Sequence, residues 1–269
     1  MYILQPIFHH DIWGGDRLAS VYGDEARGLA HLYSVRCRNG DSNIILNGKR
    51  KGMPLHGAIG EYPLSIALVD AAENLSVQVH PGGSLSKLES YYFIEPPHCG
   101  YIYCGLDLPI SGGGIMERVG RLRVSKGDYC AIEPGTVHAL TAGSFVYEIE
   151  RGADATYRLH DYGRTDRNGK PRPLHIKEAM EAADFSKKSA AAEFLPNAVK
   201  KEASYETTLL AGLGSFANDK QGFCCVTVIS GFSEIDGVPV KPGMSVMLEE
   251  GESLCCKGLE LCIAAREAT

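Results

Sequence analysis

The chain has 269 residues, of which 44% are hydrophobic, so it can bury a large core as one domain or as two smaller β-domains. Its net charge of −6 at pH 7 offers no basic field to nucleic acid or to an anionic membrane, and a small solute is therefore the favoured partner. No apolar run is long enough to span a membrane, and residues 1–6 lack the basic region of a secretory signal.

Cysteine usage indicates a reducing compartment. The nine cysteines include no C-x-x-C pair. Two adjacent pairs, Cys224 with Cys225 and Cys255 with Cys256, lie in apolar surroundings typical of strands, which favours reduced core thiols over a disulfide framework. We therefore expect a cytoplasmic protein.

The spacing of turn residues predicts a mainly β fold. Thirty-one glycines and thirteen prolines are spread between short apolar runs, as many turns between many short strands require. Near the beginning of the chain we expect only a short helix, over residues 16–23. The single tryptophan, Trp13, precedes it, and so large an apolar group is by default buried for packing.

Residues 75–81 alternate side chains with the period of a strand. Gln78 and His80 therefore project from one face while Val77 and Val79 pack on the other. An amide oxygen and an imidazole then point to one place. Such a pair alone is more often part of a polar face than a pair of metal ligands.

Two further groups of metal-ligand type follow, Glu89 and His138. The second ends an ordered pattern over residues 127–138: Gly-Asp, an apolar run, Pro-Gly, then histidine. This pattern is typical of a strand that enters a tight turn and delivers a histidine into the mouth of a small β-barrel, as in cupins. With Gln78 and His80 the two residues make an N2O2 set that suits a borderline divalent cation such as Zn²⁺.

Five segments in this order resemble the type I mannose-6-phosphate isomerases of the short bacterial kind, which belong to the cupin superfamily. The family motifs W-G-G, L-S-V-Q-V-H-P, K-x-E-x-x-Y, P-A-G-T-V-H-A and Y-R-L-Y-D-Y correspond to residues 13–15, 75–81, 87–92, 133–139 and 157–162. The resemblance implies two cupin-type jelly-roll barrels with a few helices, the N-terminal one carrying the metal site. It also implies zinc as the metal.

The resemblance assigns roles to several other residues. Arg158 and Lys87 are implied as catalytic, and Ser76, Lys87 and Trp13 as contacts of the sugar phosphate. The family often has a phosphate-facing lysine where this chain has Ala67. Relatives also carry tryptophan at the position of Tyr91.

The catalytic base is left open among Lys87, Glu148 and His160. Relatives read a glutamate, two glutamines and Ser-Asp ahead of their Thr-Tyr-Arg, where this chain has residues 148–158.

The domain organisation follows from where the patterns change. We expect a metal-binding catalytic cupin domain over residues 1–173 and a helical connection over 174–203, which includes a linker over 187–201. A degenerate cupin-like domain without metal ligands is expected over 204–269, because that segment has strands and turns but no histidine.

The activity implied is the interconversion of mannose 6-phosphate and fructose 6-phosphate through an enediolate. The same ligand set also fits a metal-binding cupin of another class, either an Fe(II) oxygenase or a non-catalytic sugar-phosphate sensor. The sequence leaves the oligomeric state open.

Overall fold

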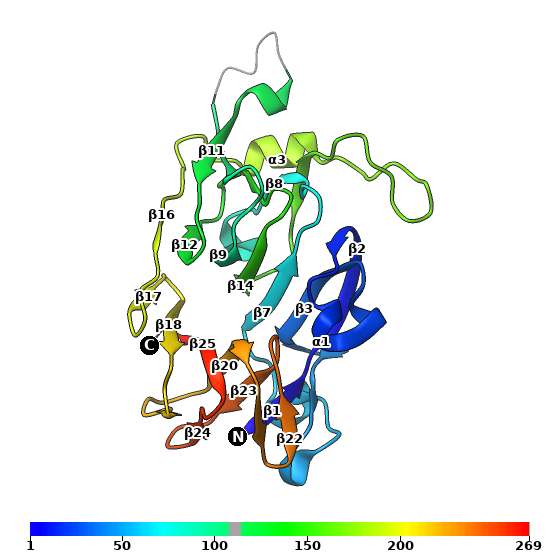
Figure 1. Cartoon of the computed structure of the whole chain (residues 1–269). Helices are drawn as coiled ribbons and strands as arrows, with labels where there is room; N and C mark the ends of the chain where they lie inside the picture. Colours follow the sequence, from blue (N-terminus) through cyan, green and yellow to red (C-terminus); the bar gives the residue numbers. More distant parts are fainter. Residues whose placement is uncertain (108–113, 269) are drawn as a thin grey trace. The chain divides into compact units, whose positions relative to one another are not determined.

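The computed structural model describes residues 1–107 and 114–268. Short strands dominate it, and the α-helices among the described residues are three short ones: α1 (Ala19–Tyr22), α2 (Leu55–Ile59) and α3 (Ile176–Ala182) (Figure 1). The same ranges contain four single 3₁₀ turns: η1 (Gly23–Ala26), η2 (Gly48–Arg50), η3 (Gly83–Leu85) and η4 (Ile115–Glu117). The predicted mainly β class is confirmed. No helix in the described ranges is long and apolar enough to cross a membrane.

The chain divides into two compact units, neither of which is a continuous segment. Unit 1 contains Met1–His9, His31–Leu68 and Phe194–Thr269, and unit 2 contains His10–Ala30 and Val69–Glu193. Three strands, β2 (Ile7–Gly15), β3 (Leu29–Val35) and β7 (Leu64–Asp70), contain residues of both units.

Unit 1 is organised around a seven-stranded sheet in the order β17-β18-β25-β20-β23-β1-β6. Every pair in it is antiparallel, and β1 pairs with β23. Smaller hairpins complete the unit. Its strands are β1 (Tyr2–Gln5), β4 (Cys37–Arg38), β5 (Asp41–Ser42), β6 (Ile44–Ile45), β17 (Val199–Lys201), β18 (Tyr205–Ala211), β19 (Ser215–Ala217), β20 (Cys224–Gly231), β21 (Ser233–Ile235), β22 (Val238–Val240), β23 (Ser245–Leu248), β24 (Ser253–Cys255) and β25 (Leu259–Glu267).

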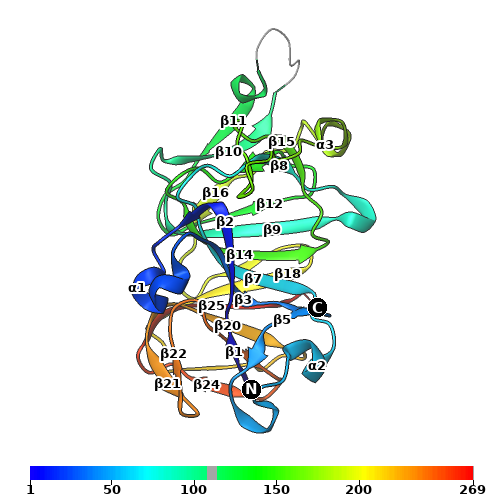
Figure 2. The same cartoon turned by 90° about the vertical axis from the view of Figure 1, so that its right-hand side faces the viewer.

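Unit 2 contains a five-stranded antiparallel sheet in the order β11-β10-β13-β8-β15. A second set of antiparallel strands runs in the order β16-β12-β9-β14, in which β12, β9 and β14 are neighbours (Figure 2). Its strands are β8 (Val77–Val79), β9 (Lys87–Glu95), β10 (Tyr101–Leu106), β11 (Val119–Arg123), β12 (Asp128–Ile132), β13 (His138–Ala139), β14 (Phe145–Gly152), β15 (Tyr157–His160) and β16 (Ala191–Glu193).

One face of the five-stranded sheet is covered by α3. Val77 and Val79 are fully buried in a cluster that also contains Ala179 of the helix, with Met180 packed against it. Since alternate residues of a strand face opposite sides, Gln78 and His80 project from the other side of β8, as predicted.

The predicted domain boundaries at residues 173 and 203 stay a prediction, and the observed units combine segments from both ends of the chain. The expected helix before the linker is present as α3. The linker expected over residues 187–201 is wrong in part, because β16 pairs with β12 and β17 pairs with β18.

Candidate metal centre

A tight turn carries His138 to its position. The backbone N–H of Thr136 donates to the carbonyl of Glu133 at 3.0 Å, and Gly135 has φ of +86°. Proline followed by a residue of positive φ is the signature of a type II turn, which explains why glycine stands there. Gly135 also donates its N–H to the His80 carbonyl at 2.8 Å. The turn therefore ties the two histidine segments together.

Strand pairing then brings three polar side chains to one face of the five-stranded sheet. Gln78 is paired with His138 on one side and with Arg158 on the other. Directly opposed residues of neighbouring strands share a face, so these three side chains lie in one row.

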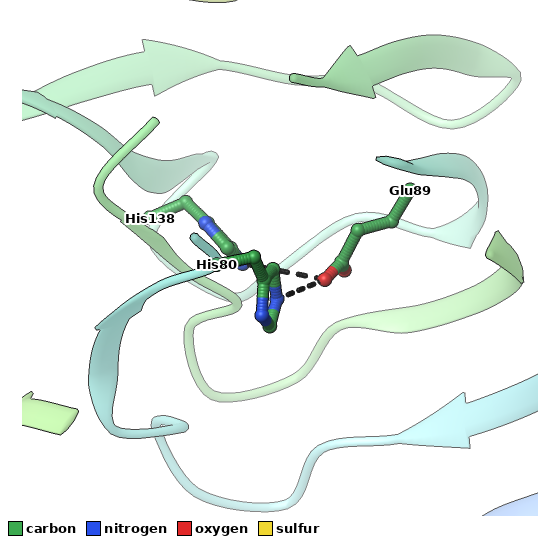
Figure 3. A group of neighbouring side chains, drawn as sticks. All are labelled: His80, Glu89 and His138. Carbon is green, nitrogen blue, oxygen red and sulfur yellow. Dashed lines mark ion pairs between the residues drawn. The ribbon is translucent and has the colours of Figure 1, made fainter. Parts of the chain in front are cut away.

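His80, Glu89 and His138 converge in the interior of unit 2 (Figure 3). Their ligand atoms all lie within 4.8 Å of one another, and the three residues are 2%, 1% and 1% exposed. His80 Nε2 lies against Glu89 Oε1, and His138 Nε2 is 3.8 Å from the same oxygen. This is the one group of three or more such ligands among the described residues.

Backbone contacts orient both imidazoles. Nδ1 of His80 is 2.9 Å from the Ala155 carbonyl, and Nδ1 of His138 is 2.9 Å from the Thr136 carbonyl. Since a carbonyl oxygen only accepts, each Nδ1 carries the proton and donates it. Each Nε2 then presents a lone pair, the form in which histidine binds a metal.

The residues present fit a divalent metal ion. His80 Nε2, Glu89 Oε1 and His138 Nε2 are buried and have no hydrogen-bond partner in the described part of the chain. Buried polar atoms of this kind are costly unless something binds them. Burial also lowers the pKa of His138 to about 4, so the imidazole is neutral at pH 7 and able to act as a ligand.

Three further charged groups, Lys87, Glu148 and Glu150, gather beside Glu89 on β9 and β14. Glu89 and Tyr91 of β9 are paired with Glu150 and Glu148 of β14, so all four side chains share a face. Lys87 Nζ lies 2.5 Å from Glu150 and 3.4 Å from Glu89. The cluster thus holds three buried carboxyl groups against one ammonium, and a divalent cation would compensate those that stay ionised.

The pKa values reflect this crowding. Burial opposes charge on Glu89, but Lys87, His80 and His138 outweigh it and hold the pKa of Glu89 well below its usual range. Burial, followed by the neighbouring carboxylates of Glu89 and Glu150, raises the pKa of Glu148 well above its usual range. Glu89 therefore stays ionised, whereas Glu148 favours its protonated form.

The other predicted site residues are placed as follows. Ser76 is buried and its hydroxyl is 3.3 Å from Gln78 Oε1. Trp13 is 4% exposed in the part of β2 that belongs to unit 2. His160, a candidate base, packs its ring edge-on against that of Tyr162, with 4.7 Å between the ring centroids. Whether these three side chains contact a substrate stays a prediction.

Arg158 is held at one end only. Its Nη1 donates to the Pro173 carbonyl at 2.9 Å, while its Nε is buried without a hydrogen-bond partner among the described residues. Burial, and then the nearby guanidinium of Arg172, lowers its pKa. A half-buried guanidinium beside a second one is suited to an anionic group.

Two residues of the centre were not assigned a place in it from the sequence. Tyr91 donates its hydroxyl to Glu89 Oε2 at 2.5 Å, and Glu150 pairs with Lys87. The available signal was the two-residue spacing of Lys87, Glu89 and Tyr91, which puts all three on one face of the strand.

Similarity to known proteins identifies the family. Mannose-6-phosphate isomerase ManA of Bacillus subtilis is 31% identical over 210 residues, which are 67% of this chain and 67% of that protein. The chain belongs to the mannose-6-phosphate isomerase family. No model in a scan of protein families matches the chain.

Solved structures of that family share the fold. The crystal structure of mannose 6-phosphate isomerase from Bacillus subtilis superposes with a TM-score of 0.73 at 24% identity, over 98% of this chain and 99% of that one. The Salmonella typhimurium enzyme bound to fructose 6-phosphate and zinc superposes with a TM-score of 0.68 at 13% identity, over 100% of both chains. The predicted cupin-type fold is confirmed.

The C-terminal segment is expected to bind no metal. From residue 204 onward the chain contains no histidine, and the described residues of unit 1 form no group of three neighbouring His, Cys, Asp or Glu side chains able to hold a metal. Titration of the full chain with Zn²⁺ should therefore reach one tightly bound ion. A second tight ion that persists in His138→Ala would contradict this expectation.

Proposed function

We propose that this chain interconverts mannose 6-phosphate and fructose 6-phosphate through an enediolate. The observation that carries the proposal is the buried His80–Glu89–His138 group in a member of the mannose-6-phosphate isomerase family. Two neutral imidazoles and one carboxylate, with Gln78 as a fourth donor, favour zinc as the resident metal. When bound, the ion would act as a Lewis acid and stabilise negative charge on the sugar oxygens.

Arg158 acts from the same row of side chains as Gln78 and His138. Its guanidinium keeps its charge at every physiological pH and presents a planar fork of donors. We assign it to orient the open-chain sugar and to stabilise the oxyanion that develops as the proton leaves C2.

Lys87 and Glu148 remain the nearest candidates for moving the proton between C2 and C1. Both lie on the face of the β9–β14 pair that carries Glu89. Lys87 is bound between Glu150 and Glu89, which fixes the position of its ammonium group. Ser76 and Trp13 complete the proposed contacts of the sugar phosphate.

The test is a metal-dependent isomerase assay. Protein freed of metal with a chelator should form no fructose 6-phosphate from mannose 6-phosphate, and one equivalent of Zn²⁺ per chain should restore turnover. Oxygen consumption is measured in parallel with Fe²⁺ as the added ion. Turnover of oxygen without isomerisation, or tight sugar-phosphate binding without any product, would contradict the proposal.

Phosphate recognition provides a further prediction, because Glu150 pairs with the lysine assigned to the phosphate. Removing that carboxylate in Glu150→Gln should leave Lys87 freer to attract the substrate. We expect KM for mannose 6-phosphate to fall by about two- to tenfold, which corresponds to about 0.5–1.5 kcal/mol. The gain should shrink as salt is added.

Free mannose is the matched control substrate, since it lacks the phosphate. An equal gain with both sugars would show that Glu150 does not act through the phosphate. Ala67→Lys, which would restore the family lysine, is the weaker test because Ala67 is 1% exposed and the new ammonium would be buried.

A further inference from the structure

The two oxygens of Glu89 have different surroundings. Oε1 lies against His80 Nε2, 3.8 Å from His138 Nε2 and 3.4 Å from the Lys87 ammonium, and it makes no hydrogen bond of normal geometry among the described residues. Oε2 instead accepts a hydrogen bond from the hydroxyl of Tyr91. One oxygen is therefore directed to the candidate metal centre, and the other is held away from it.

Tyr91 is well placed to hold that arrangement. It is 2% exposed on the same face of β9 as Glu89, two residues further along the strand. Its ring packs edge-on against Phe93 at 6.4 Å, and its backbone is paired with Cys130 of β12 and Glu148 of β14. The paired backbone and the buried, packed ring restrict the directions in which Tyr91 can present its hydroxyl.

The distinction between the two oxygens decides how Glu89 can bind a metal. A carboxylate with both oxygens free binds either through one oxygen or through both, and the second mode occupies an additional coordination position. An open position is what a catalytic zinc site needs for its substrate. A hydrogen bond to Oε2 favours binding through Oε1 alone and so keeps that position free.

We propose that Tyr91 is a positioning residue that restricts Glu89 to binding the metal through Oε1. The inference rests on the proposed metal centre but not on the identity of the sugar.

The experiment compares Tyr91→Phe with the parent protein after loading with Co²⁺, whose visible absorption reports coordination number. Phenylalanine keeps the ring and removes only the hydroxyl. We expect the spectrum to shift toward higher coordination as Glu89 binds through both oxygens. Metal affinity is measured by competition with a chelator. It should change by about tenfold, which is within the usual range for a residue that hydrogen-bonds a metal ligand without itself binding the metal.

Tyr92→Phe is the matched control, because the neighbouring residue faces the other side of β9. It should leave the Co²⁺ spectrum unchanged. Melting of both metal-free variants separates a loss of packing from an effect on the ion. A crystal structure of the zinc-loaded parent gives a second measurement that needs no variant, with Oε1 alone expected at ligand distance.

Two results would overturn the inference: a Tyr91→Phe spectrum and affinity equal to those of the parent, or a parent structure with both oxygens of Glu89 on the ion. Neither readout depends on turnover. If the isomerase assay fails while Tyr91→Phe still shifts the Co²⁺ spectrum as expected, the proposed function is refuted and this inference stands.

Discussion

Replacing His138 with alanine is expected to remove both the metal and the activity. The side chain is 1% exposed, and its Nε2 lies 3.8 Å from Glu89 Oε1, the oxygen that His80 also contacts. Without the imidazole the metal loses one protein ligand, and water must take that coordination position. Losing a residue that hydrogen-bonds a metal ligand typically weakens metal binding by about tenfold to a hundredfold, and losing a direct ligand should weaken it by more than that. Metal content after dialysis and isomerase turnover are measured together, and His80→Ala should behave alike.

His56→Ala is the matched control, because His56 lies in α2 of unit 1. It should retain one metal ion and the parent turnover. Full metal occupancy with normal turnover in both His80→Ala and His138→Ala would remove the basis of the site assignment. Equal loss in His56→Ala would point instead to a general loss of folding.

Arg158→Lys is expected to lower kcat by about a hundredfold with a much smaller change in KM, the usual cost of removing one donor from an oxyanion site. An ammonium group retains the charge but cannot reproduce the planar fork of donors. The guanidinium is anchored at the Pro173 carbonyl through Nη1, and its buried Nε has no hydrogen-bond partner among the described residues. Steady-state kinetics on mannose 6-phosphate measure the effect.

Arg167→Lys makes the same substitution at an exposed position of the following loop and should leave both constants unchanged. If Arg158→Lys keeps the parent kcat, then Arg158 has only a structural role, in fixing the segment around Pro173. A large rise in KM with kcat unchanged would assign it to ground-state binding of the sugar.

Local patterns were sufficient for the parts of the centre that lie within one strand or one turn. Alternation put Gln78 and His80 on the face opposite Val77 and Val79, and the burial of the two valines under α3 agrees with that prediction. The Pro-Gly turn before His138 could be predicted because glycine is the residue that adopts positive φ without steric cost. The order of motifs also indicated that Glu89 joins the two histidines.

Only the tertiary structure decided which groups share a face across strands. The pairing of β9 with β14 sets Glu150 beside Lys87, and the packing of Tyr91 between β12 and β14 directs its hydroxyl to Glu89. Likewise, β1 pairs with β23 at the other end of the chain, a pairing that local composition does not predict. The periodicity of a strand fixes which face a residue occupies, but the partner opposite it depends on register between segments far apart in sequence.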